Sequence, residues 1–122
     1  MQSGTIRENI TFHSEFDQAR YDGTVRACGL LADFDAFAEG DMTEVAGQGA
    51  SFSGGQRQRV PLARAVYSSA PTLLMDDVFS ALDVHTTNYI FNELFREGFV
   101  GESTVILEFP FAFSNPSFPY GG

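Results

Sequence analysis

The sequence reads FSGGQRQRVPLARAV from Phe52 to Val66, and the interpretation of the rest of the chain starts from this stretch. Ser53 is a good N-cap residue, so we expect a helix from here to about Ser69. Apolar residues recur at helical spacing and predict the inner face of this helix: Ala63, Val66 and Tyr67. The first N–H groups of a helix have no partner inside it and carry partial positive charge. The helix start is therefore a candidate seat for an anion, although an ordinary cap followed by a glycine turn explains the same residues.

Pro61 lies well inside the same predicted helix. A proline there removes one backbone hydrogen bond and crowds the preceding turn, at a cost of about 3 kcal/mol. Two interpretations are open, a kink with a function or a substitution tolerated under weak selection. We favour the second.

The residues after this helix predict a strand, a helix and a second strand. TLLMD at residues 72–76 and STVIL at residues 103–107 are the strands. The helix between them is expected from about Asp83 to Gly98. Its inward-facing residues are predicted to be Ile90, Phe91, Leu94 and Phe95. This order makes a βαβ unit, so the predicted fold class is α/β with a parallel sheet.

Asp76 and Asp77 stand where the first predicted strand ends. A carboxylate at the C-terminal end of a buried parallel strand can hold Mg²⁺, and an adjacent one can orient water. Acids that only solvate the following loop are the equally open alternative.

The residues before the helix that starts at Ser53 predict shorter helical pieces. Residues 3–12 are expected to form a turn and a short helix. Asp17 is expected to cap a helix through about Leu31, and Asp33 to cap another that carries Phe34 and Phe37. Residues 39–50 are polar and contain glycine, so we expect a loop. Cys28 has helical spacing with Tyr21 and Val25, which predicts a buried thiol.

The composition limits the classes of protein to consider. The 122 residues suffice for one domain with a modest core. The net charge of −9 argues against a nucleic-acid-binding protein. All seven basic residues are arginines, so a site that needs a lysine is excluded within these residues. No apolar run approaches the roughly 20 residues that span a bilayer. His13, His85 and Cys28 are scattered, which gives a zinc site no support.

Three motifs in this order closely resemble the nucleotide-binding domain of an ABC transporter. FSGGQRQR resembles the signature motif, with Phe52 in place of the usual leucine, and TLLMDD resembles the Walker B motif. SALD at residues 80–83 matches the D-loop. SGTIRENITF, GDMTEV and LARAVYS are most similar to the first such domain of the multidrug-resistance-protein (C) subfamily. The resemblance covers about residues 3–107.

The resemblance implies a role for each matched residue. The signature residues would contact the γ-phosphate of an ATP held by an opposite nucleotide-binding domain: Ser53, Gly54, Gly55 and Gln56. Asp76 would help to hold Mg²⁺, and Asp77 stands in the place of the catalytic glutamate, one methylene shorter. The D-loop residues would lie at the seam between the two domains: Ser80, Ala81, Leu82 and Asp83. The family's partners are that second domain and transmembrane domains, and its place is the cytosolic face of a membrane.

The sequence also departs from the family pattern. It has no G-x-x-x-x-G-K-[ST] loop, no Q-loop glutamine, and Pro110 where a switch histidine is expected. We therefore expect an incomplete P-loop NTPase sheet with an α-helical signature subdomain in residues 1–107, and an irregular tail outside the family in residues 108–122. We expect the chain alone neither to hydrolyse ATP nor to bind it tightly.

Two other functions stay open besides an ATP-binding part of an exporter. The chain could be a non-enzymatic interaction module, or a truncated remnant without function, that docks on an intact nucleotide-binding domain. A self-standing acidic domain that binds a metal through Asp76 and Asp77 requires the motif match to be a coincidence.

Overall fold

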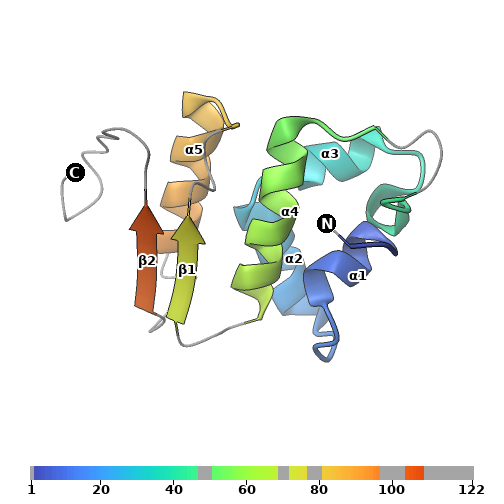
Figure 1. Ribbon diagram of the computed structural model, residues 1–122, viewed down its shortest axis with the longest axis horizontal. Helices are drawn as coiled ribbons and strands as arrows, with labels where there is room; N and C mark the ends of the chain where they lie inside the picture. Colours follow the sequence, from blue (N-terminus) through green and yellow to red (C-terminus); the bar gives the residue numbers. More distant parts are fainter. Residues whose placement is uncertain (1, 47–50, 69–71, 77–80, 97–103, 109–122) are drawn as a thin grey trace.

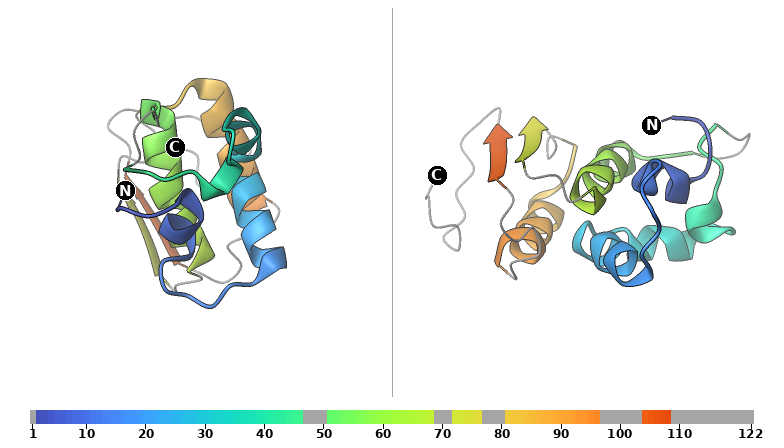
Figure 2. Two further views of the ribbon diagram at one scale, coloured as in Figure 1. Left: turned by 90° about the vertical axis from the view of Figure 1, so that its right-hand side faces the viewer. Right: turned by 90° about the horizontal axis from the view of Figure 1, so that it is seen from below.

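The structure, a computed structural model, describes residues 2–46, 51–68, 72–76, 81–96 and 104–108. The helical part contains α1 (Ile6–Thr11), α2 (Gln18–Ala27), α3 (Leu31–Ala36), the 3₁₀ turn η1 (Gly40–Met42) and α4 (Gly54–Tyr67). The other part contains β1 (Thr72–Asp76), α5 (Val84–Phe91), the π-helical turn η2 (Asn92–Arg96) and β2 (Thr104–Glu108). Helix α4 lies between the strand pair and helix α1, and α2 runs alongside α4 (Figures 1 and 2).

Strands β1 and β2 pair in parallel, with Thr72 opposite Thr104 and Asp76 opposite Glu108. Helix α5 lies on one side of this pair (Figure 2). The strand–helix–strand order and the parallel pairing are those that the sequence predicts for residues 72–108. The carboxyl ends of parallel strands lie at the same edge of a sheet, so Asp76 and Glu108, the last residues of β1 and β2, lie at one edge.

One buried apolar cluster joins α1, α2, α4 and α5. Helix α4 contributes Val60, Leu62, Ala63, Val66 and Tyr67, which confirms the predicted inner face. Cys28 is fully buried in this cluster, and burial raises the pKa of its thiol to about 12. The predicted buried thiol is therefore confirmed, and it is protonated at neutral pH. His13 and His85 are exposed.

Helix α2 begins at its predicted cap, because the Asp17 carboxylate accepts a hydrogen bond from the Arg20 N–H at 3.0 Å. The helix ends at Ala27, earlier than the predicted Leu31. Gly29 has a φ of +69°. The N–H groups of Gly29 and Leu30 bond back to the carbonyls of Arg26 and Val25 at 3.1 and 3.0 Å. This is a Schellman C-cap, and it turns the chain toward α3.

The predicted capping role of Asp33 is wrong. Helix α3 begins at Leu31, two residues before Asp33, and its N-cap residue Leu30 makes no side-chain capping bond. Asp33 lies in the first turn of α3, and its carboxylate is bonded to Arg59 and Gln56 of α4 instead. A bidentate arginine gives a carboxylate a stronger partner than the backbone N–H groups of a six-residue helix. Phe34 and Phe37 are partly buried against the core.

Tyr67, at the end of α4, ties this helix to the segment before α2. Its hydroxyl donates to the Glu15 carbonyl at 2.7 Å and accepts from the Asp17 N–H at 2.9 Å, while its ring is fully buried. We expect Tyr67→Phe to lower the free energy of unfolding by about 1–2 kcal/mol, because two backbone groups lose a partner. Urea unfolding measures this. Tyr89→Phe is the matched control: it removes one bond, to the Arg26 carbonyl, from a side chain that is 41% exposed. Equal effects for the two variants would contradict the prediction.

Candidate functional site

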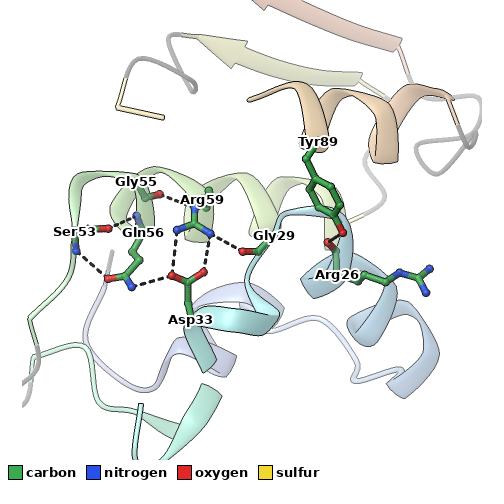
Figure 3. Close-up of polar contacts among 8 residues, drawn as sticks. All are labelled: Arg26, Gly29, Asp33, Ser53, Gly55, Gln56, Arg59 and Tyr89. Carbon is green, nitrogen blue, oxygen red and sulfur yellow. Dashed lines mark hydrogen bonds and ion pairs between the residues drawn. The ribbon is translucent and has the colours of Figure 1, made fainter. Parts of the chain in front are cut away.

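The start of α4 is built as a capping box (Figure 3). The Ser53 hydroxyl oxygen accepts from the Gln56 N–H at 3.1 Å, and the Ser53 N–H donates to the Gln56 side-chain oxygen at 2.8 Å. The predicted N-cap role of Ser53 is therefore confirmed. Gln56 completes the cap from three residues further on, as the S-x-x-Q spacing allows.

Gly54 and Gly55 occupy the first two positions of α4, where N–H groups have no carbonyl partner inside the helix. The aligned peptide dipoles add partial positive charge at this end. Ser53 and Gly54 are exposed, so an anion can reach them from solvent. An exposed helix start of this kind is able to bind an anion.

The two glycines also make room for the segment Ala81–Asp83. Neither glycine is among the described residues with positive φ, so their backbone conformation does not require glycine. A Cβ on Gly54 would lie 3.3 Å from the Cβ of Ala81, and a Cβ on Gly55 would lie 3.0 Å from Cδ2 of Leu82. Close packing against this segment is therefore a second reason for glycine here, beside the approach of an anion.

Gln58 holds the same segment from α4. Its side-chain oxygen accepts from the Ala81 N–H at 2.9 Å. Asp83 then caps α5, with its carboxylate accepting from the Thr86 N–H at 2.7 Å. This bond to Thr86 lowers the pKa of Asp83 below its usual range. The structure thus brings the predicted signature residues together with Ala81 and Leu82 within one chain.

An ion pair between Asp33 and Arg59 lies next to the capping box (Figure 3). The guanidinium contacts both carboxylate oxygens, at 2.7 and 3.2 Å, and the two side chains are only 12% and 16% exposed for arginine and aspartate. Arg59 also donates to the carbonyls of Gly29 and Gly55. Its position therefore links α3, the turn after α2 and the start of α4.

The structure gives less information on three of the predicted site residues. Asp77 and Ser80 lie outside the described residues. Asp76 is the last residue of β1, at the predicted C-terminal strand end. Their roles stay predictions.

Sequence reasoning missed Asp33, Gln58 and Arg59 as parts of this site. Arg59 follows Gly55 by one helical turn, so its bond to the Gly55 carbonyl could have been expected. The pairing of Asp33 with Arg59 leaves no local pattern in the sequence.

We expect Ser53→Ala to lower the free energy of unfolding by about 1 kcal/mol, because the alanine cannot accept from the Gln56 N–H. Chemical unfolding followed by far-UV circular dichroism measures this. Ser68→Ala is the matched control at the other end of α4, where the hydroxyl donates to the Ala65 carbonyl. If Ser68→Ala lowers the free energy of unfolding as much as Ser53→Ala does, the bond from the Gln56 N–H to the Ser53 hydroxyl does not stabilise the chain.

Among the described residues, no helix is long and apolar enough to cross a membrane. In the same ranges no three His, Cys, Asp or Glu side chains gather as a possible metal site.

Comparison with known proteins matches residues 2–80 to the family described as "ABC transporter". The ATP-binding cassette transporter abc4 of Schizosaccharomyces pombe is 48% identical over 107 residues, 88% of this chain and 7% of that protein. The vacuolar heme ABC transmembrane exporter abc3 of the same yeast is 52% identical over 104 residues, 84% of this chain and 7% of that protein. ATP-binding cassette sub-family C member 2 of Rattus norvegicus is 45% identical over 94 residues, 77% of this chain and 6% of that protein. The chain thus spans a small part of the length of these relatives.

Proposed function

Because the chain belongs to the ABC transporter family, we propose that the start of α4 contacts the terminal phosphate of an ATP held by a second nucleotide-binding domain. The chain corresponds to part of the ATP-binding domain of exporter-type proteins of the C subfamily. The observation that carries the proposal is the exposed helix start with its capping box at Ser53 and Gln56.

The residues present fit one side of a phosphate site. The N–H groups of Gly54 and Gly55 and the dipole of α4 attract negative charge. The Ser53 hydroxyl accepts from the Gln56 N–H, so its own proton is left to donate to a phosphate oxygen. Arg59 is tied to Asp33 and to two carbonyls, so it serves the scaffold of the site.

The finer assignments extend this proposal. Asp76 helps to hold Mg²⁺, and Asp77 stands in the place of the catalytic glutamate. The position of Asp76 at the C-terminal end of a parallel strand supports the first role. In fold terms, α1–α4 are the helical signature subdomain, and β1 and β2 belong to a larger P-loop NTPase sheet.

The partners follow from the same proposal. Ala81, Leu82 and Asp83 lie at the seam with the second nucleotide-binding domain, and transmembrane domains complete a transporter at the cytosolic face of a membrane. ATP binding closes the two nucleotide-binding domains and hydrolysis reopens them. The relatives whose names describe a transporter or an exporter support this assembly.

ATP-dependent association tests the proposed contact. The purified chain is titrated against an intact nucleotide-binding domain of a C-subfamily relative, with ATP or with ADP, by isothermal titration calorimetry. We expect binding with ATP that falls at least tenfold with ADP, and a comparable loss in Ser53→Arg, which blocks the helix start. Ser68→Arg places the same side chain at the other end of α4 and should leave association unchanged. Equal association with ATP and ADP would sink the proposal.

We expect Mg·ATP to leave the melting temperature of the chain alone unchanged. Its 122 residues contain no lysine and no glycine-rich phosphate-binding loop, so only one side of the phosphate site is present. A circular dichroism melt with and without Mg·ATP measures this, and phosphate-release assays check turnover. A ligand of the native state raises the melting temperature by mass action, so a clear shift would contradict the expectation.

A non-enzymatic interaction module is the second candidate. The exposed helix start with its capping box supports this candidate as well, because an ATP held by another domain would meet α4 from that side. The test is the ATP turnover of the intact partner on addition of this chain. A change in the partner's ATP turnover supports a module that completes or blocks the partner's site. An unchanged turnover argues against the module and in favour of the first proposal.

A further inference from the structure

The side-chain amide of Gln56 is held between two neighbours. Its oxygen accepts from the Ser53 N–H at 2.8 Å, and its nitrogen donates to Oδ1 of Asp33 at 2.9 Å. An ionised carboxylate can only accept hydrogen bonds, so the amide nitrogen has to face Asp33. The amide oxygen then has to face the Ser53 N–H. Asp33 thus selects one of the two orientations of the Gln56 amide.

Arg59 fixes Asp33 in its turn. It contacts both carboxylate oxygens and two carbonyls, and the ion pair is largely shielded from solvent. The arginine also cancels a negative charge that would otherwise stand next to the anion seat. Arg59, Asp33 and Gln56 form a chain of contacts that ends at Ser53 (Figure 3).

We propose that Asp33 is a positioning residue for Ser53 and acts through the side-chain amide of Gln56. In this arrangement the Gln56 side chain holds the cap, and the phosphate contacts come from Ser53 and the backbone N–H groups. The phosphate part of this inference rests on the function proposed above, while the orientation of Ser53 does not.

Three variants separate positioning from stability. Asp33→Asn removes the carboxylate that selects the amide orientation. Gln56→Glu keeps the S-x-x-E form of the capping box but sets two carboxylates against each other. In the double variant Asp33→Asn with Gln56→Glu, the asparagine amide donates to the glutamate, whose other oxygen accepts from the Ser53 N–H. The polarity of the contact is reversed and the link is restored, although the Asp33–Arg59 ion pair stays absent.

The first readout is the hydrogen exchange rate and the ¹H–¹⁵N chemical shift of the Ser53 amide in the full chain. We expect exchange about tenfold faster in each single variant, the size of one lost hydrogen bond, and a return to within about twofold of wild type in the double variant. The melting temperature reports stability separately and should stay low in the double variant. A purely structural role would leave the double variant as impaired at Ser53 as Asp33→Asn.

The second readout is the ATP-dependent association with an intact nucleotide-binding domain. We expect the affinity to follow the Ser53 amide: reduced about tenfold in the single variants and recovered in the double variant. If the wild-type chain does not associate, the proposed function fails. The positioning role of Asp33 is then tested by the exchange rate and chemical shift of the Ser53 amide alone. If the Ser53 amide of Asp33→Asn has the exchange rate and chemical shift of the wild type, the proposal is overturned. If Asp33→Asn does not fold, Gln56→Glu and the double variant give the same comparison.

Discussion

Replacing Arg59 by alanine is expected to lower the free energy of unfolding by about 3 kcal/mol, the largest loss among the substitutions considered. The guanidinium makes two contacts to Asp33 and donates to the carbonyls of Gly29 and Gly55. Its removal leaves the Asp33 carboxylate, only 16% exposed, without its charge partner. An unpaired charge of this kind costs several times more than one neutral hydrogen bond. Guanidinium unfolding measures the difference.

Two controls sharpen this experiment. Arg57→Ala removes an exposed arginine from the same helix and should change the free energy of unfolding by about 0.5 kcal/mol or less. The double variant Arg59→Ala with Asp33→Ala removes both charges. It should be less destabilised than the sum of the two single variants, because neither charge is left unpaired. Additive effects would mean that the two side chains do not interact in solution.

Replacing Pro61 by alanine is expected to raise the free energy of unfolding by about 2–3 kcal/mol. Helix α4 runs without a break from Gly54 to Tyr67 with Pro61 inside it. The proline has no N–H for the carbonyl of Arg57, and its ring crowds that turn. Pro61 is exposed, so its removal opens no cavity. A part of the gain is offset because proline also restricts the unfolded chain.

Pro61→Gly separates the effect of removing proline from the helix propensity of the residue that replaces it. Glycine restores the N–H and removes the ring, but its helix propensity is about 1 kcal/mol worse than that of alanine. We expect it to stabilise less than alanine by about that amount. Alanine no more stable than proline would show that the helix is interrupted at this position in solution.

Helix α4 forms despite Pro61 because tertiary burial outweighs the local cost. Its five buried residues join the common core, and burying a side chain such as Val60 or Leu62 contributes about 1.5–3 kcal/mol each. The helix continues through Pro61. The choice between a kink with a function and a tolerated substitution stays open. The effect of Pro61 on function is a matter for the association experiment.

The local features were predictable from the sequence. Ser53 begins α4, Asp17 begins α2 and Asp83 begins α5, since capping depends on residues three positions apart. The β1 and β2 segments lie within one residue of the predicted runs, because short apolar and β-branched runs are a local signal. The signature stretch likewise indicated its family before any fold was known, and the match over residues 2–80 confirms it.

The role of Asp33 was decided only by the tertiary structure. Its sequence position suggests a helix cap, but the Schellman turn at Gly29 starts α3 earlier and brings the carboxylate to Arg59, which lies 26 residues further along the chain. Partners this far apart in sequence leave no periodic signal, because their distance depends on how α2, α3 and α4 pack. The sequence by itself determined where α2, α4 and α5 begin and which motif α4 carries. The packing decided which charged side chains lie next to that motif, because a largely buried carboxylate is stable only beside the cation that the fold brings to it.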